Sequence, residues 1–203
     1  MIVFIYSLKG GSGKSTLSLL LSYSMSLKKN KVTLLSVEPS TELSLLEQRS
    51  LVLDDHPEFS FLSCSTDQLS AVFSRFESSS EILIIDFPCA LSAKAAEEIQ
   101  RKSACILIPF DGHLFSVTKA MESALRSIRI NPGSRVAFIP VEKSKVGFLY
   151  SSDLNSALSS LAYVSQPIPF SAKLTSLRSL KVGDLLTQKC LLVLEELCKY
   201  VLK

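Results

Sequence analysis

The chain of 203 residues alternates short runs of consecutive apolar residues with longer stretches in which apolar residues recur every three or four positions. The short runs, such as ILII, CILI and VAFI, are typical of strands that are buried on both faces of a sheet. The longer stretches have the spacing of helices that bury one face. Strands are predicted at 2–8, 32–37, 59–64, 82–86, 104–109, 136–141 and near Val164, and helices at 14–28, 66–76, 90–102, 114–129, 151–162 and 183–201.

This alternation of strands with helices predicts parallel strands joined by helical crossovers. We therefore expect an α/β fold of three layers, in which a mostly parallel sheet of about seven strands is flanked by helices. No linker, repeat or low-complexity tract divides the sequence, whose length suits one hydrophobic core. Residues 1–203 are expected to form a single domain.

Composition narrows the class of protein further. Apolar residues make up 47% of the chain and charged residues 20%, as in a globular protein. No apolar run reaches the roughly 18 residues that a membrane-spanning helix needs, and the first residues lack the charged region of a signal peptide. The five cysteines include no C-x-x-C pair, which disfavours a disulfide framework, a zinc site or an iron–sulfur cluster. We expect a cytoplasmic protein with reduced thiols.

A glycine-rich turn, LKGGSGKST at 8–16, follows the first predicted strand and precedes a predicted helix. Its glycines let the backbone turn tightly, with N–H groups toward phosphate oxygens, and the helix adds its positive end. Lys14 is expected to reach the β- and γ-phosphates, and the Ser15 hydroxyl to ligate Mg²⁺. The usual pattern G-x-x-x-x-G-K-[ST] is incomplete, because Leu8 occupies its first glycine position. The residues predicted to bind nucleotide phosphates here are Gly10, Gly11, Ser12, Gly13, Lys14, Ser15 and Thr16.

An additional lysine, Lys9, gives the loop the form K-G-G-x-G-K-[ST]. This resembles the deviant Walker A motif of the ParA/MinD family of P-loop ATPases, whose members need no glycine where Leu8 stands. The resemblance implies the P-loop NTPase fold, with ATP and Mg²⁺ as cofactors, and a homodimer that encloses two nucleotides. It also implies that Lys9 reaches the phosphates bound by the partner subunit, so Lys9 and Lys14 are both assigned as catalytic residues.

Three later segments extend the resemblance over most of the chain. EILIIDFP at 81–88 is similar to the family's Walker B strand, which implies that Asp86 holds Mg²⁺ through water. ACILIPFDGHLFSVTKAMESAL at 104–125 is similar to the next strand and helix. VSQPIPFSAKLTSL at 164–177 is similar to a segment near the adenine. The base pocket is therefore expected to include Pro167, Pro169 and Phe170.

The sequence departs from the family after the second strand, where relatives have D-x-D-P-Q and this chain has SVEPS at 36–40. Glu38 replaces the aspartate that positions the attacking water, and is assigned as catalytic. Glutamate shifts the carboxylate by one methylene, and a displacement of about 1 Å can cost on the order of 100-fold in rate. The first aspartate is replaced by Ser36, so we expect ATP binding to be better preserved than hydrolysis. Cys89, which also departs from the family pattern, is expected to have a packing role.

The charge of the chain is uneven, at −4 for residues 1–100 and +7 for residues 101–203. The resemblance favours a ParA-like ATPase that segregates or positions DNA, binds it non-specifically in the ATP state, and hydrolyses ATP slowly under the stimulus of a ParB-like or other cargo adaptor. The ATP-bound protein would then associate with the nucleoid. Because the chain starts at its first strand, we expect no N-terminal helix-turn-helix domain. Basic loop residues would contact DNA instead: Lys143, Lys145, Lys173, Arg178 and Lys181.

Other functions of the same fold stay open. A MinD-like membrane switch would need an amphipathic C-terminal helix; the segment 185–203 is amphipathic but lacks a strongly basic face, so membrane binding is not expected. An ATP-binding regulator with little hydrolysis is suggested by Ser36 and Glu38. A small-molecule ligase, like the dethiobiotin synthetase relatives, is disfavoured because Lys9 suits a dimer switch.

Overall fold

The computed structural model describes residues 1–38, 42–89, 92–143, 152–169, 171 and 180–203. Its centre is a seven-stranded sheet in the order β3-β2-β4-β1-β5-β6-β7, in which all neighbouring strands are parallel. The predicted α/β architecture is therefore confirmed. The strands are β1 (Ile2–Ile5), β2 (Val32–Val37), β3 (Ser60–Cys64), β4 (Ile82–Asp86), β5 (Cys105–Phe110), β6 (Arg135–Pro140) and β7 (Tyr163–Val164).

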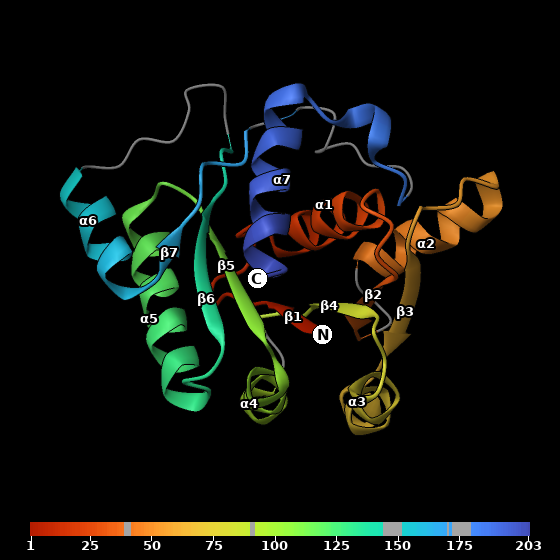
Figure 1. The fold of residues 1–203 in the computed structure, drawn as a ribbon, viewed down its shortest axis with the longest axis horizontal. Coiled ribbons are helices and arrows are strands. Elements are labelled where there is room, and N and C mark those ends of the chain that lie inside the picture. Colours follow the sequence, from red (N-terminus) through yellow and green to blue (C-terminus); the bar gives the residue numbers. More distant parts are fainter. Residues whose placement is uncertain (39–41, 90–91, 144–151, 170, 172–179) are drawn as a thin grey trace.

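Helices cover both faces of this sheet and complete three layers (Figure 1). The helices α1, α2 and α7 pack on one face, and α3, α4, α5 and α6 pack on the other. Two short 3₁₀ turns, Thr66–Gln68 and Gly183–Leu185, precede α3 and α7. The helices are α1 (Lys14–Ser26), α2 (Glu42–Leu53), α3 (Leu69–Glu77), α4 (Ala93–Lys102), α5 (Leu114–Ile130), α6 (Ser152–Leu161) and α7 (Gln188–Val201).

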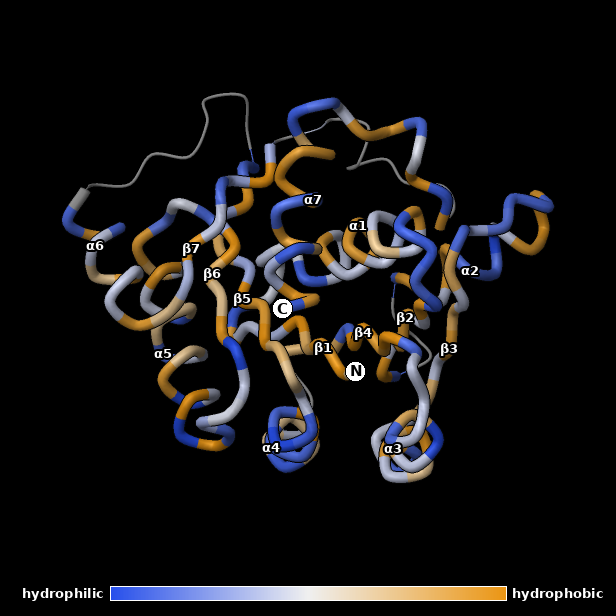
Figure 2. Tube along the Cα trace, in the orientation of Figure 1, coloured by the Kyte–Doolittle hydropathy of each residue, from blue (hydrophilic) through white to orange (hydrophobic). Residues whose placement is uncertain are grey.

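The two faces of β1 show how the core is divided. Val3 and Ile5 face α1 and α7, whereas Phe4 packs into the cluster of α3, α4 and α5, as the two-residue period of a strand requires. All four residues of β1 are buried, so the strand has no polar position (Figure 2). This burial on both sides explains why the sequence signal was a continuous apolar run.

In the part of the chain that the structure describes, the sequence pattern did not predict the helix α2. Its buried side chains include Leu43 and Leu46, but Leu45 and Val52 are exposed. Apolar residues therefore lie around the whole circumference of α2, and no polar face marks it as an amphipathic helix.

The strand predicted at 2–8 ends earlier, at Ile5. The Tyr6 N–H still donates to the Leu107 carbonyl at 2.9 Å, but the Leu8 N–H turns to the Ser123 hydroxyl. The chain therefore leaves the sheet before the glycine-rich turn begins. Similarly, the last helix starts at Gln188 rather than at residue 183. Its N-terminus is capped by the Thr187 hydroxyl, which accepts a hydrogen bond from the Cys190 N–H at 3.3 Å.

The apolar side of α7 packs against α1 and the sheet. Leu194 and Leu197 are fully buried in this cluster, and the Cys198 thiol donates to the Ser24 hydroxyl of α1. The amphipathic pattern of α7 is thus accounted for by packing within the chain. Among the described residues, no helix combines the length and apolar character needed to cross a bilayer.

We predict that Leu194→Ala lowers the free energy of unfolding by about 2–5 kcal/mol, because it removes a fully buried side chain and leaves a cavity. Leu192→Ala on the same helix is the matched control, because Leu192 is 61% exposed; its effect should stay within about 0.5 kcal/mol. Urea denaturation measures both, and equal effects of the two substitutions would show that α7 does not pack as described.

Candidate functional site

The glycine-rich turn joins the end of β1 to the start of α1. Gly11 has φ 65° and Gly13 has φ 94°, both in the left-handed region that disfavours a side chain. The Gly13 carbonyl accepts the first helical hydrogen bond from the Leu17 N–H at 2.9 Å. Gly13 therefore sets the direction in which α1 leaves the loop, and the sequence prediction of a phosphate-binding turn has the backbone geometry that it requires.

The loop also has polar groups that suit an anion. The Ser12 hydroxyl is buried and has no hydrogen-bond partner among the described residues. Among the described residues, no side chain caps the N-terminus of α1, and the first turn of this helix contains no acidic residue. Exposed N–H groups at a helix N-terminus, together with the helix dipole, form a binding site for phosphate oxygens. The loop residues therefore fit the phosphates of a nucleotide.

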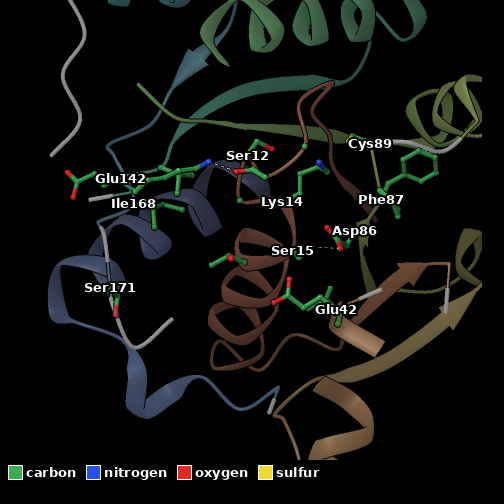
Figure 3. Close-up of a pocket in the computed structure, with 18 of the residues that line it drawn as sticks. Ser12, Lys14, Ser15, Glu42, Asp86, Phe87, Cys89, Glu142, Ile168 and Ser171 are labelled. Atoms are coloured by element: carbon green, nitrogen blue, oxygen red, sulfur yellow. Dashed lines mark hydrogen bonds between the residues drawn. The ribbon is translucent and has the colours of Figure 1, made fainter. Parts of the chain in front are cut away.

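Asp86 lies at the carboxyl end of β4, directly opposite the first turn of α1. Its carboxylate accepts hydrogen bonds from the Ser15 hydroxyl at 2.8 Å and the Ser18 hydroxyl at 3.3 Å (Figure 3). Burial raises the pKa of Asp86, and the bond from Ser15 and the charge of Lys14 only partly oppose this. Hydroxyl and carboxylate oxygens are the donors that Mg²⁺ prefers, so Ser15 and Asp86 fit the predicted metal site.

Lys14 lies inside the site. Its side chain comes from the first residue of α1, and its Nζ donates to the Lys9 carbonyl at 3.2 Å. Burial lowers the pKa of Lys14, while Cys89 and Asp86 act in the opposite direction. The amine is thus held in the loop by one backbone carbonyl, a contact that phosphate oxygens could replace with charge-assisted bonds.

These groups line a cavity of about 650 Å³, a size suited to a small-molecule ligand. Figure 3 shows Lys14, Ser15 and Asp86 on one side of this cavity and Glu142 and Ile168 on another. The cavity is lined by Gly10, Gly11, Ser12, Gly13, Lys14, Ser15, Thr16, Glu42, Leu43, Leu46, Asp86, Phe87, Pro88, Cys89, Val141, Glu142, Lys143, Ile168, Pro169 and Ser171.

Lys9 does not line this cavity. Its Nζ forms an ion pair of 2.7 Å with Asp111, at the end of β5, and its side chain is 21% exposed. The amines of Lys9 and Lys14, which are close in sequence, therefore bind different partners. The different roles assigned to these two lysines stay a prediction.

Of the residues predicted to contact DNA, the structure describes Lys143 and Lys181. Lys143 lies at the mouth of the cavity, where its Nζ pairs with Asp111 at 2.9 Å and donates to the Gly11 carbonyl. Lys181 pairs with Asp55 at 3.3 Å. The two lysines thus contact different parts of the chain, and Lys143 belongs to the surroundings of the nucleotide site. Lys145, Lys173 and Arg178 lie outside the described residues.

On the predicted base side of the site, Pro169 lines the cavity together with Ile168, whereas Pro167 does not. A parallel bridge joins Ile168 to Val141, directly after β6. This pairing brings the late Ile-Pro segment to the cavity. Phe170 lies outside the described residues.

Glu38, the predicted catalytic carboxylate, stands directly after β2 with φ 77°. Its N–H donates to the Cys64 carbonyl at 2.7 Å, and it does not line the cavity. Glu42, at the start of α2, does line it, with its carboxylate toward Ser15 in Figure 3. Sequence analysis missed Glu42 because it missed the helix that carries it.

Two further residues differ from the sequence expectation. Cys89 is exposed and lines the cavity rather than packing in the core, and a Cβ at Gly10 would lie 3.4 Å from its sulfur. Asp111 was not singled out, although an aspartate just beyond a buried strand is a signal that could have drawn attention to it. Its two lysine partners are distant in sequence, so only the fold reveals the cluster.

Most of the chain is similar to a known family of nucleotide-binding domains. The family model described as the CobQ/CobB/MinD/ParA nucleotide binding domain matches residues 3–180. The resemblance inferred from the loop and the later segments is thereby confirmed. No curated protein sequence matches the chain.

Solved structures with a similar fold include three nucleotide complexes. The septum site-determining protein MinD of Pyrococcus horikoshii, with Mg-ADP, has a TM-score of 0.74 and 16% identity over 98% of this chain and 95% of that one. A variant of McdA of Cyanothece, in complex with ATP, has a TM-score of 0.71 and 18% identity, and the match covers 99% of this chain and 95% of that one. A putative plasmid partition protein of Borrelia burgdorferi, bound to AMPPNP, has a TM-score of 0.70 and 16% identity, and the match covers 99% of this chain and 98% of that one. At these identities the similarity shows the fold.

We predict that Asp86→Asn stabilises the nucleotide-free protein at pH 7.5 by about 1 kcal/mol while weakening Mg²⁺-dependent nucleotide binding. Burial raises the folded-state pKa of Asp86, so the charged carboxylate opposes folding above that pKa. The advantage of the variant should therefore vanish as pH falls from the folded pKa to the unfolded value of about 3.9.

Urea denaturation with EDTA at pH 7.5 and at pH 4 measures this difference. Ser18→Ala removes one hydrogen bond to the same carboxylate and serves as a control that should destabilise the protein at pH 7.5. A variant Asp86→Asn that is less stable than the wild type at pH 7.5 would contradict the prediction.

Proposed function

The chain belongs to the family of CobQ/CobB/MinD/ParA nucleotide-binding domains, and we propose that it is a ParA-like ATPase that uses ATP to change from a monomer into a dimer. The dimer would segregate or position DNA. One observation carries the nucleotide part of this proposal: the complete K-G-G-x-G-K-S loop lies opposite the buried Asp86, which is hydrogen-bonded to Ser15.

Different residues of the site would bind the phosphates, the Mg²⁺ ion and the adenine of ATP. The N–H groups after Gly10 and the amine of Lys14 would hold the phosphate oxygens, and the buried Ser12 hydroxyl would gain a partner. Ser15 and Asp86 would hold Mg²⁺, which neutralises phosphate charge during phosphoryl transfer. The adenine would lie toward Pro169, on the far side of the cavity.

The dimer part of the proposal is supported by the position of Lys9. Its Nζ lies at Asp111, outside the cavity of its own chain, so it is not committed to the phosphates bound there. In a sandwich dimer the two phosphate loops face each other, and Lys9 would contact the nucleotide of the partner. The positive charge of Lys9 would reduce the repulsion between the two facing triphosphates.

Hydrolysis needs a carboxylate that orients the attacking water, and Glu38 is our assignment for this role. Ser36 replaces the other acidic residue of the family pattern, and Glu38 carries a longer side chain than aspartate. We therefore propose slow turnover that increases when an adaptor protein, ParB-like or other, binds the dimer. Binding of ATP then acts as the switch, and hydrolysis resets it.

DNA is the proposed partner because the second half of the chain has a net charge of +7. Non-specific binding through phosphate contacts needs only such basic residues. The candidates for these contacts are Lys143, Lys145, Lys173, Arg178 and Lys181. Lys143 would have to leave Asp111 before it could contact DNA. The protein would be cytoplasmic and nucleoid-associated in its ATP state.

Two alternatives have unequal support. A membrane-associated, MinD-like role would use α7, but the apolar side of this helix is buried against α1. An ATP-binding regulator with little hydrolysis is favoured by the Ser36 and Glu38 departures and by the position of Glu38 outside the cavity lining. Turnover stimulated by DNA and an adaptor separates the ATPase from such a regulator.

We predict that Lys14→Ala weakens ATP binding by about 100-fold, because it removes charge-assisted bonds to the phosphates. Lys9→Ala should leave the ATP affinity of the monomer within about threefold of the wild type, yet abolish the ATP-dependent dimer. Fluorescent ATP titration and light scattering with ATP, ADP and no nucleotide measure the two properties.

The same samples are tested for binding of a random-sequence DNA duplex at low and moderate salt. Salt-sensitive DNA binding by the ATP-bound wild type, and none by Lys9→Ala, is the expected result. A wild-type protein that binds ATP but stays monomeric and ignores DNA in every state would overturn the partition role and favour the regulator.

We also predict that Glu38→Gln lowers the ATP turnover number by about 100-fold, because the amide cannot act on the attacking water, while ATP affinity is retained. Glu42→Gln is the matched comparison, since Glu42 is the carboxylate that lines the cavity. Single-turnover hydrolysis measures both variants. If Glu42→Gln abolishes turnover and Glu38→Gln does not, the assignment of Glu38 is wrong.

A further inference from the structure

Cys89 is an exposed thiol that lines the nucleotide cavity. It follows β4, whose last residue is Asp86, and in Figure 3 it lies on the same side of the cavity as Lys14. A Cβ added at Gly10 would lie 3.4 Å from the Cys89 sulfur, so this sulfur stands directly beside the backbone of the phosphate loop. A group bonded to the sulfur would therefore occupy space next to the loop.

The other thiols of the chain are shielded from reagents. The four buried cysteines are Cys64, Cys105, Cys190 and Cys198. Burial raises the pKa of all four thiols, to about 11 for Cys64 and Cys190 and to about 12 for Cys105. The thiolate is the form of cysteine that attacks electrophiles, so these thiols are unreactive at neutral pH. In the folded chain a thiol reagent is expected to react at Cys89.

The cavity next to Cys89 is suited to an anion. The Ser12 hydroxyl, which also lines it, is fully buried and has no hydrogen-bond partner among the described residues, so a ligand oxygen would satisfy it. The N-terminus of α1 adds its N–H groups. Burial lowers the pKa of Lys14, and a charge on Cys89 opposes this more strongly than Asp86 does, so the sulfur lies within electrostatic reach of the amine.

We propose that Cys89 makes this cavity a modification site for small anionic disulfides of the glutathione class. A carboxylate of the reagent takes the place of phosphate oxygens and accepts hydrogen bonds from the Ser12 hydroxyl, the Lys14 amine and the N–H groups of the loop. The disulfide is thereby held beside the Cys89 sulfur. The effect of the modification on ATP rests on the proposed nucleotide site, whereas the reaction itself does not.

The reaction is a thiol–disulfide exchange. Cys89 gives its proton to solvent, and its sulfur attacks one sulfur of the reagent, so that a new S–S bond forms as the S–S bond of the reagent breaks. The Cys89 sulfur is oxidised, and the departing sulfur is reduced and leaves as a thiolate that takes up a proton. The mixed disulfide then fills space beside Gly10 that phosphates need. Excess thiol reverses the exchange by the same chemistry.

The first test measures which thiols react in the folded chain without nucleotide. The reagent is dithiobis(nitrobenzoate), an anionic disulfide whose released thiolate is followed by absorbance, and mass spectrometry locates the label. Rapid labelling should occur at Cys89, be absent from Cys89→Ala, and extend to the four buried cysteines only in urea. A folded chain that is not labelled at Cys89 would overturn the proposal.

The second test asks whether the site selects for negative charge. The labelling rate of Cys89 with dithiobis(nitrobenzoate) is compared with its rate with cystamine, a disulfide that carries two positive charges. Each rate is divided by that of an uncharged peptide with one cysteine, which removes the intrinsic difference between the reagents. The normalised rate should be about tenfold higher for the anionic disulfide. Equal normalised rates would show an ordinary exposed thiol and overturn the proposal.

Variants of the anion-binding groups locate the source of this selectivity. Lys14→Ala and Ser12→Ala should each reduce the preference for the anionic disulfide, because each removes a donor to its carboxylate. Lys199→Ala is the matched control, since Lys199 pairs with Glu195 on α7 and does not line the cavity. A preference that is unchanged in both cavity variants would mean that the anion binds elsewhere and would overturn the proposal.

Competition tests the same site in the unaltered chain, so it does not depend on whether the variants fold. Inorganic pyrophosphate should slow the labelling of Cys89 by the anionic disulfide and not by cystamine. No effect of pyrophosphate on either reagent would contradict a shared anion site.

The consequence for nucleotide is measured as MgATP affinity before and after labelling. Labelled wild-type protein should bind MgATP at least about tenfold more weakly, and dithiothreitol should restore binding. The affinity of Cys89→Ala should be the same before and after the treatment. Unchanged MgATP affinity of the labelled wild type would overturn the placement of the adduct in the cavity. An untreated chain that binds no MgATP would instead overturn the proposed function, and the labelling and pyrophosphate results would still decide this proposal.

Discussion

The parallel pairing of β1 with β4 on one side and β5 on the other is the constraint on which the site depends. Ile5, the last residue of β1, is in register with Asp86 of β4 and with Leu107 of β5. Parallel strands end at the same edge of a sheet, so the phosphate loop, the Asp86 carboxylate and the Asp111 carboxylate meet there although they are distant in sequence. β1 lies in the middle of the sheet and is buried on both faces, so it is held between β4 and β5.

The edge formed in this way concentrates ionised groups that water cannot fully solvate. Asp111 is paired with two lysines, whereas Asp86 accepts hydrogen bonds from the hydroxyls of Ser15 and Ser18, which only partly offset its burial. Such compensation is necessary because an unpaired buried charge is very unfavourable. It also fixes the charged groups before a ligand arrives, so little reorganisation is required on binding.

The sequence alone allowed correct predictions where the structure depends on a local pattern of residues. Continuous apolar runs marked the strands, and the spacing of Lys9, Gly13 and Lys14 marked the loop, because each feature is encoded within a few residues. The sequence was insufficient where apolar residues surround a helix, as in α2, and so it missed Glu42. It was also insufficient for Asp111, whose partners come together only through strand order. Glu38 has φ 77° and does not line the cavity, and no spacing rule anticipates either feature.

The packing of α7 on α1 relates the nucleotide site to the order in which the chain is synthesised. The helix that presents Lys14 and Ser15 is covered by side chains from Gln188–Val201, including Leu194 and Leu197. These residues emerge from the ribosome after every other described helix. Until then α1 lacks part of its apolar cover, although the loop, β1 and β4 have long been made. The helix that carries Lys14 and Ser15 is therefore made early but is among the last to receive its full apolar cover.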